Sequence, residues 1–260
     1  MKLKALREVA VCAAKEAGTI QREWLRKEKR VELKGEINLV TEVDRRCERR
    51  IVEIIKNKFP HHNILTEETL MPEYSSAFRW IIDPLDGTTN YTHGYPCFCT
   101  SIALEVEEDI ALGVIYDPIL QELFIAEKGR GAFLNGKKIF VSPSDKLIKA
   151  LISTGFPYDL RESRENNVNH FCSFIMEARA IRRDGSAALD LCYVAMGRFD
   201  GFWELKLNPW DVAAGKIVVE EAGGLVTDFG GKPFNIYGKE ILATNGKIHK
   251  EMLKILQKKT

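Results

Sequence analysis

The sequence lacks a long hydrophobic run. No apolar stretch approaches the roughly 18 to 20 residues that cross a bilayer as a helix. Charged residues interrupt the N-terminal apolar positions, which predicts an amphipathic helix and not a signal peptide; they are Arg7, Glu8, Lys15 and Glu16. These absences predict a soluble protein with no membrane partner.

Paired cysteines are also missing. The six cysteines have neither CxxC spacing nor the density of a disulfide-stapled secreted domain; they are Cys12, Cys47, Cys97, Cys99, Cys172 and Cys192. Reduced thiols and a cytoplasmic location are therefore expected. Cys97 and Cys99 lie two residues apart in a strand-like run and share one face, where they either pack as small apolar residues, as we favour, or meet each other or a metal.

An excess of charge of one sign is absent too. The 38 basic and 37 acidic residues leave a formal net charge of +1, so no global field attracts nucleic acid or an anionic membrane. The basic runs Arg26–Arg30 and Lys258–Lys259 are predicted to be solvated surface. We expect no nucleic-acid partner, and any anion must be held by a local site.

The sequence does contain the material for a large core, with 45% hydrophobic and 29% charged residues. Apolar periodicity predicts helices over residues 3–25 and 44–58, with extended chain over 31–43. A buried strand and an antiparallel meander follow. These strands are predicted at 80–82, 102–106, 111–116 and 123–127, with a hairpin turn at Asn135-Gly136.

After residue 145 the pattern changes to alternating strands and helices. Strands are predicted at 150–154, 180–183, 199–204 and 225–228, and helices at 164–177, 186–196, 209–222 and from about 247. We therefore divide the chain into an N-terminal α+β half, residues 1–145, and a C-terminal α/β half, residues 146–260. Because no repeat or flexible linker separates them, we expect one tightly joined, layered α/β unit.

One motif carries chemistry. A predicted strand leads into Asp83-Pro84-Leu85-Asp86-Gly87-Thr88-Thr89, in which two aspartates precede a glycine and hydroxyl residues that can open a helix. Proline orients the backbone so that both carboxylates and the Leu85 carbonyl converge, and Gly87 lets the chain approach an anion closely. Amides at the helix start would then hold phosphate oxygens. The alternative is an ordinary turn, which uses the same residue types.

Three further acidic positions favour a metal site. Asp44, the pair Glu67-Glu68 and Asp211 each stand at a junction of strand, loop and helix, where side chains can converge on a cavity. Asp44 and Asp211 have an alternative role as helix caps. Carboxylates without nearby histidine ligands favour Mg2+ over zinc, and the isolated His93 is predicted either to be structural or to support the metal ligands from behind.

These stretches together resemble the inositol monophosphatases, a family of lithium-sensitive, metal-dependent phosphatases, over nearly the whole chain. The two signature stretches are Trp80–Asn90 and Trp210–Gly215, and the flanking pieces are Leu39–Asp44, Thr66–Glu68, Gly185–Ala188 and Glu220–Gly224. The resemblance implies an α/β (α+β) fold, a layered αβαβα sandwich of the inositol monophosphatase and fructose-1,6-bisphosphatase type. It also implies a homodimer.

The resemblance implies two to three Mg2+ ions per subunit. The first would be held by Glu67, Asp83 and the Leu85 carbonyl, and the second by Asp83, Asp86 and Asp211. A weaker third ion would use Glu67 and water, with Glu68 as an outer neighbour.

Roles in catalysis and binding follow from the same likeness. Thr88, hydrogen-bonded to Asp44, would orient the attacking water with help from Glu67. The phosphate would be bound by Asp86, Gly87 and Thr88, and the polyol by Gly185, Ser186, Ala187 and Glu204. Lys34, in the loop before Asp44, would either contribute near the metals or be solvated.

The implied reaction is Mg2+-dependent hydrolysis of a phosphate monoester, above all myo-inositol 1- or 4-monophosphate. Related enzymes with the same metal core act on fructose 1,6-bisphosphate or 3′-phosphoadenosine phosphates. A second phosphate would need basic residues at the pocket rim, and the candidates, whose alternative is surface salt bridges, are Arg161, Arg164, Arg182, Arg183 and Lys206. A regulatory binding protein on the same fold is a further alternative, opposed by the complete carboxylate set.

Overall fold

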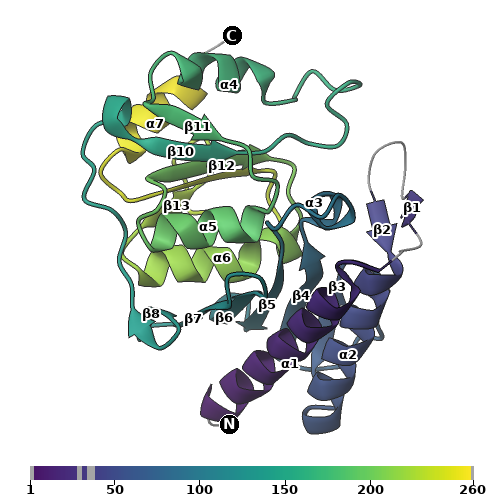
Figure 1. Ribbon diagram of the computed structural model, residues 1–260. Coiled ribbons are helices and arrows are strands. Elements are labelled where there is room, and N and C mark those ends of the chain that lie inside the picture. Colours follow the sequence, from purple (N-terminus) through teal and green to yellow (C-terminus); the bar gives the residue numbers. More distant parts are fainter. Residues whose placement is uncertain (1–2, 28–30, 34–38, 259–260) are drawn as a thin grey trace.

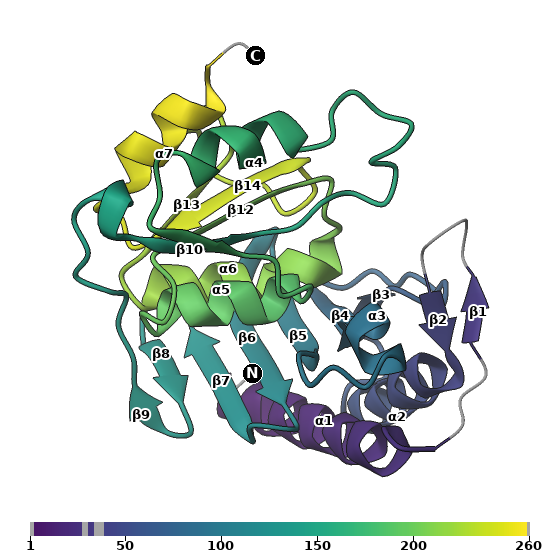
Figure 2. The same ribbon diagram turned by 45° about the horizontal axis from the view of Figure 1, so that its top comes forward.

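The computed structural model describes residues 3–27, 31–33 and 39–258. Their helices and strands stack in five alternating layers, with a helix pair at each outer surface and a third pair between two sheets (Figures 1 and 2). The predicted layered αβαβα sandwich is thus confirmed. None of the described helices is both long and apolar enough to cross a membrane. All six cysteines lie within the described ranges and are unpaired.

The first layer is the helix pair α1 (Leu3–Trp24) and α2 (Glu42–Lys58). In α2 the buried apolar residues Val43, Cys47, Ile51 and Ile55 recur every four residues or so, which puts one stripe against the sheet. A two-stranded antiparallel ribbon, β1 (Val31–Leu33) and β2 (Leu39–Thr41), stands between the two helices in the chain. Of the predicted surface lysines and arginines, Arg26, Lys27 and Lys258 are exposed, and residues 28–30 and 259 lie outside the described ranges.

The second layer is a seven-stranded sheet in which strand order follows chain order. Its strands are β3 (Asn63–Thr66), β4 (Phe78–Asp86), β5 (Cys99–Val106), β6 (Asp109–Asp117), β7 (Glu122–Glu127), β8 (Gly131–Leu134) and β9 (Lys137–Lys138). β3 pairs with β4 in parallel, and every later pair is antiparallel, so the predicted meander is confirmed. The register of β4 against β5 shifts between Asp83 and Asp86, a bulge that re-aims the end of β4.

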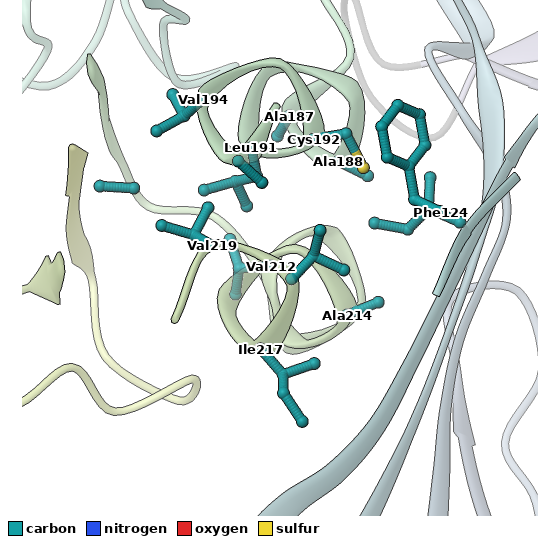
Figure 3. Close-up of a cluster of buried hydrophobic side chains, with 14 of the residues drawn as sticks. Phe124, Ala187, Ala188, Leu191, Cys192, Val194, Val212, Ala214, Ile217 and Val219 are labelled. Carbon is teal, nitrogen blue, oxygen red and sulfur yellow. The ribbon is translucent and has the colours of Figure 1, made fainter. Parts of the chain in front are cut away.

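The middle layer is the helix pair α5 (Ala187–Ala195) and α6 (Pro209–Glu221), which lies between the two sheets and is apolar on several sides (Figure 3). The two helices approach closely because Gly215 on α6 faces the Leu191 side chain on α5. A Cβ on Gly215 would lie 2.4 Å from Leu191 Cδ1. Against the large sheet, a Cβ on Gly113 would lie 2.7 Å from the Ala214 carbonyl oxygen. Small residues therefore set the spacing of the layers on both sides of α6.

The fourth layer is a five-stranded sheet, and the fifth is the helix pair α4 (Val168–Ile175) and α7 (His249–Leu256). The sheet order is β11-β10-β12-β14-β13, with bounds β10 (Leu151–Thr154), β11 (Ala180–Arg182), β12 (Gly201–Leu205), β13 (Leu225–Thr227) and β14 (Glu240–Thr244). β10 runs parallel to β11 and β12, whereas β14 is antiparallel to β12 and β13. Short helices η1 (Leu147–Lys149) and α3 (Thr88–Thr92) complete the described elements.

Two features of the C-terminal half differ from the sequence-based prediction. β14 was not predicted, because Ile-Leu-Ala is a short apolar run with no period of its own. The helix expected over 164–177 is only Val168–Ile175. It begins late because Asn167 has φ of 70°, and its side-chain amide donates to Thr154 Oγ1 and to the Gly155 carbonyl.

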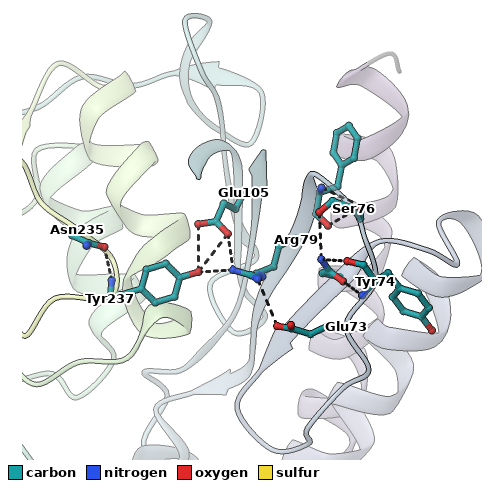
Figure 4. Close-up of polar contacts among 9 residues, drawn as sticks. Glu73, Tyr74, Ser76, Arg79, Glu105, Asn235 and Tyr237 are labelled. Atoms are coloured by element: carbon teal, nitrogen blue, oxygen red, sulfur yellow. Dashed lines mark hydrogen bonds and ion pairs between the residues drawn. The ribbon is translucent and has the colours of Figure 1, made fainter. Parts of the chain in front are cut away.

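Polar contacts also tie the two sheets together (Figure 4). Tyr237, in the segment between β13 and β14, meets Arg79 on β4 at 3.2 Å between Oη and Nη1, and Arg79 pairs with Glu105 on β5 at 3.3 Å. Near the middle of the chain, Val141 N donates to the Ala222 carbonyl at 3.2 Å. The division of the chain at residues 145 and 146 itself stays a prediction.

Candidate active site

A single cavity gathers residues from both sheets and from the first turns of α5 and α6. Eleven of the twelve predicted site residues line it: Glu67, Asp83, Leu85, Asp86, Gly87, Thr88, Gly185, Ser186, Ala187, Glu204 and Asp211. The twelfth, Asp44, lies behind Thr88 and contacts it. Residues up to 167 positions apart in the sequence thus meet where β4 ends and two helices begin, a position where backbone amides favour anions.

Asp83 and Asp86 are oriented by the bulge at the end of β4. Asp83 Oδ1 accepts a hydrogen bond from Leu85 N at 2.9 Å, as expected for a side chain that turns its own backbone. Asp86 Oδ2 accepts from Ser186 Oγ at 2.6 Å and from Ala188 N at 2.8 Å, so the start of α5 holds it. The Ser186 hydroxyl that was predicted to contact the polyol is therefore committed to Asp86.

Asp44 combines the two roles that the sequence left as alternatives. It is the third residue of α2, where its Oδ2 accepts from Thr41 N at 2.8 Å and so closes the capping box of the helix. Its Oδ1 accepts from Thr88 Oγ1 at 2.8 Å. Because one carboxylate oxygen serves the helix and the other serves Thr88, the cap fixes the direction of the Thr88 hydroxyl. Burial raises the pKa of Asp44.

The cavity concentrates negative charge. Burial raises the pKa of Asp83 well above its usual range, and the neighbouring Glu67, Asp86 and Asp211 raise it further. Burial, then Asp86, raises the pKa of Asp211 in the same way, although Asn208 N donates to its Oδ2 at 2.7 Å. For Asp86, burial raises the pKa to about 6 against the opposing hydrogen bond from Ser186. When these carboxyl groups are ionised together, a bound cation is needed to offset the repulsion between them.

The donors fit a hard divalent cation. Four carboxylates and the Leu85 carbonyl offer only oxygen, which is the ligand preference of Mg2+. Within residues 3–27, 31–33 and 39–258, no three His, Cys, Asp or Glu side chains are grouped so that they could hold a metal ion as they stand. The residues fit Mg2+ because every proposed ligand atom is an oxygen.

Glu204 forms the back of the cavity on β12. It faces Gly155, where a Cβ would lie 2.1 Å from Glu204 Oε1, so only glycine leaves room for the carboxyl group. Burial raises the pKa of Glu204 to about 8, Asp211 adds to the rise, and the Arg183 guanidinium opposes it. At neutral pH the group therefore holds a proton in the cation-free protein and can donate as well as accept.

We expect this proton to couple stability to pH. The folded-state pKa of Glu204, about 8, exceeds the ordinary value of 4.5. Its contribution is thus fully present below pH 4.5 and is lost as pH rises to about 8, by up to about 1.4 kcal/mol per pH unit. Glu204→Gln should flatten that decline, measured by urea unfolding in chelator from pH 4.5 to 8. Equal slopes for the two proteins would contradict the assignment.

Other predicted residues lie elsewhere. The backbone N of Glu68 donates to Glu48 Oε2 at 2.9 Å, which anchors the end of β3 to α2. His93 Nδ1 contacts the Thr89 carbonyl at 2.8 Å, in keeping with the structural role predicted for it. Lys34 lies outside the described residues. Of the five basic candidates for the rim, only Arg183 lines the cavity.

Several residues that line the cavity were not predicted from the sequence. Asp190 is 1% exposed, and burial raises its pKa well above the usual range. Its signal in the sequence was its position one helical turn after Ser186, on the same face of α5. Phe156 and Tyr158 also line the cavity. They lie in an irregular segment after β10, where no helix or strand pattern in the sequence indicated a site.

The model of the inositol monophosphatase family matches residues 2–260. The chain belongs to the inositol monophosphatase family. An inositol-1-monophosphatase of Synechocystis is 48% identical over 84% of this chain and 77% of its own length. The Nus factor SuhB of Pseudomonas aeruginosa is 45% identical over 84% of this chain and 82% of its own.

Solved structures agree with this inositol monophosphatase fold. The inositol monophosphatase of Anabaena superimposes with a TM-score of 0.91 at 43% identity, over 100% of this chain and 98% of that one. Two neighbours at 26% identity carry ligands: one, with a TM-score of 0.82 over 96% of this chain and 92% of its own, is bound to inositol monophosphate. The other, an IMPase/NADP phosphatase with a TM-score of 0.87 over 99% and 97%, is complexed with NADP and Ca2+. Members of the family are phosphatases, and this chain is an enzyme of that class.

Proposed function

We propose that this inositol monophosphatase homologue hydrolyses myo-inositol 1- or 4-monophosphate to inositol and phosphate with two to three Mg2+ ions. The observation that carries the proposal is the hydrogen bond from Thr88 to Asp44 at the edge of a cavity whose lining includes Glu67, Asp83, Asp86 and Asp211. The solved neighbour bound to inositol monophosphate supports a phosphorylated polyol as substrate. We extend the proposal to a cytoplasmic, lithium-sensitive homodimer, as the family resemblance implies.

The cation would be held by oxygen donors alone. The proposed ligands are Glu67, Asp83, the Leu85 carbonyl, Asp86 and Asp211. Bound there, Mg2+ supplies charge neutralisation for the phosphate and a lowered pKa for a coordinated water. The amides of Gly87 and Thr88 and the first turns of α5 and α6 would face the phosphate oxygens.

The protein residues themselves would direct the water. Thr88 Oγ1 donates a hydrogen bond of 2.8 Å to Asp44 Oδ1, which leaves the lone pairs of Thr88 Oγ1 to accept a hydrogen bond from a water in the cavity. The water is thereby aimed, and its proton has a path through Thr88 toward Asp44, with Glu67 assisting. Burial raises the pKa of Asp44, which improves it as a proton acceptor. Glu204 would bind the hydroxyl groups of the polyol.

Phosphate release from inositol 1-phosphate tests the proposal directly. We expect turnover with Mg2+ and a fall of at least about 10³-fold in excess chelator, because uncompensated carboxylates repel the phosphate. Restoring Mg2+ should restore the rate, which serves as the control for damage by the chelator. Turnover that persists in chelator would refute the metal-assisted mechanism.

A regulatory role is the second candidate, favoured by one observation, the 45% identity to a relative named Nus factor. The site residues are complete, as expected for a working phosphatase and not for a fold retained only for binding. A pull-down that recovers a stoichiometric partner, from a protein with no phosphatase activity in Mg2+, would reverse this ranking.

A further inference from the structure

A buried glutamine joins α1 to the end of β4. Gln21 is 0% exposed, and every other buried residue of α1 is apolar or glycine. Burying an amide among such residues costs free energy unless hydrogen bonds offset the loss of contact with water. The partners of the Gln21 amide therefore show why a polar residue lies on this face of the helix.

The Gln21 amide holds the Pro84 carbonyl. Gln21 Nε2 donates to the Pro84 carbonyl oxygen at 2.9 Å and to Thr100 Oγ1, on β5, at 2.9 Å. Thr100 Oγ1 in turn donates to the Pro84 carbonyl at 3.2 Å. Pro84 lies in the bulge between Asp83 and Asp86, where the ladder between β4 and β5 is interrupted and backbone groups lose their strand partners. Two side chains thus replace the missing partner of this carbonyl.

The hydrogen bonds to Pro84 fix one peptide group. The carbonyl of this group belongs to Pro84, and its N–H belongs to Leu85 and donates to Asp83 Oδ1 at 2.9 Å. Donors at the carbonyl polarise the peptide group, which strengthens its N–H as a donor to the carboxylate. The fixed plane also restricts the backbone of Leu85, whose own carbonyl is a proposed metal ligand. One peptide group therefore connects α1 to two of the proposed ligands.

The backbone of Gln21 is held from the far side of the motif. Tyr91 Oη donates to the Gln21 carbonyl oxygen at 2.8 Å. Tyr91 is buried on α3, the short helix that begins directly after Gly87. The segment that runs from Pro84 to Tyr91 is thus attached to a single residue of α1 at two points.

Packing alone does not account for this glutamine. Its Oε1 atom is buried without a hydrogen-bond partner among residues 3–27, 31–33 and 39–258. A buried acceptor that is left unsatisfied destabilises a fold, and an apolar side chain of the same length would avoid that cost. The donor that Gln21 supplies to Pro84 explains the residue instead.

We propose that Gln21 is a positioning residue for the cation site: it holds the peptide group between Pro84 and Leu85 so that Asp83 and the Leu85 carbonyl keep fixed directions. This inference rests on the proposed function, which places Mg2+ at these ligands. Gln21 does not line the active-site cavity, so it acts through the ligands and not on the substrate. Groups that orient a metal ligand from behind typically change metal affinity by about 10- to 100-fold.

Gln21→Met tests the proposal, because methionine has nearly the same length and no donor. Titration calorimetry with Mg2+ alone should show a Kd about tenfold higher than that of the native protein. The kcat for inositol 1-phosphate at saturating Mg2+ should stay close to native, since the ligands themselves are unchanged. The urea midpoint of unfolding in chelator should also stay near native, because the unsatisfied oxygen is removed and Pro84 keeps the Thr100 hydroxyl as a donor.

A double-mutant cycle with Thr100→Val separates positioning from general damage. Each single change leaves Pro84 one side-chain donor, whereas the double variant leaves it none, so the rise in its Kd for Mg2+ should exceed the product of the two single effects. Thr227→Val is the matched control. It removes a buried hydroxyl that donates to the Asp228 carbonyl at 2.7 Å, in the small sheet, and it should keep the native Kd.

A native Kd for Mg2+ in Gln21→Met, even with lowered stability, would show a purely structural role and overturn the proposal. A double variant whose Kd rises only by the product of the single effects, or an equal weakening in Thr227→Val, would overturn it too. A native protein that neither binds Mg2+ nor releases phosphate from inositol 1-phosphate would instead refute the proposed function.

Discussion

Asp83→Asn is expected to lower kcat/KM for inositol 1-phosphate by about 10³-fold while the metal-free protein becomes more stable. Asp83 is one of the proposed ligands, so its loss would remove negative charge from the site that would hold the cations. The same carboxylate is buried beside Glu67, Asp86 and Asp211, which raise its pKa together with burial. Neutral asparagine relieves that repulsion, and its side-chain oxygen can still accept from Leu85 N.

The two readouts separate this outcome from misfolding. Steady-state kinetics in Mg2+ gives the loss of activity, and urea unfolding in chelator gives the gain in stability. Asp117→Asn is the matched control: Asp117 is 1% exposed on β6, outside the cavity, and caps a turn by accepting from Ile119 N. It should retain most activity. Near-native turnover in Asp83→Asn, or a stability loss equal to that of the control, would contradict the role assigned to Asp83.

Gly87→Ala should destabilise the fold by about 3 kcal/mol and remove most activity. Gly87 has φ of +94°, and a Cβ there would lie 2.8 Å from the Cys97 carbonyl oxygen and 3.2 Å from Phe98 Cα. Backbone atoms cannot move aside as a flexible side chain can. The end of β4 must therefore shift, and with it Asp86 and Thr88.

Gly94→Ala separates crowding from conformation. Gly94 also has a positive φ, +71°, but nothing lies within 4 Å of its Cβ position. Only the left-handed backbone is then penalised, by about 1 kcal/mol, and activity should stay close to native. Urea unfolding and initial rates measure both variants. Equal losses in the two would show that crowding against Cys97 and Phe98 has no part in shaping the site.

Much of the site could be predicted from local sequence because its residues belong to short motifs with a fixed geometry. Asp44 and Asp211 were ambiguous between helix cap and site, and the structure explains why: each is the third residue of its helix, accepts a backbone N–H, and still reaches the cavity region. Capping and site formation use different parts of one carboxylate. A local pattern therefore could not separate them.

The remainder depended on long-range packing. Ser186 was predicted to contact the polyol, and its hydrogen bond to Asp86 was not predicted because Asp86 is 100 residues away in the sequence. Asn167 delays the start of the expected helix through hydrogen bonds to Thr154, at the end of β10, and to Gly155. β14 closes the small sheet between β12 and β13, a position set by pairing and not by its own residues. Each of these partners lies outside the helix or strand of the residue concerned.

The position of α5 and α6 in the sequence affects how the chain folds during its synthesis. The face of the large sheet that carries Ile81, Ile115 and Phe124 is covered by α5 and α6, which residues 187–221 provide. The sheet itself is complete by residue 138. During synthesis a nearly finished sheet would therefore wait with one apolar face uncovered until some 80 further residues emerge. That interval, more than any step in the folded enzyme, is when this protein is most exposed to aggregation.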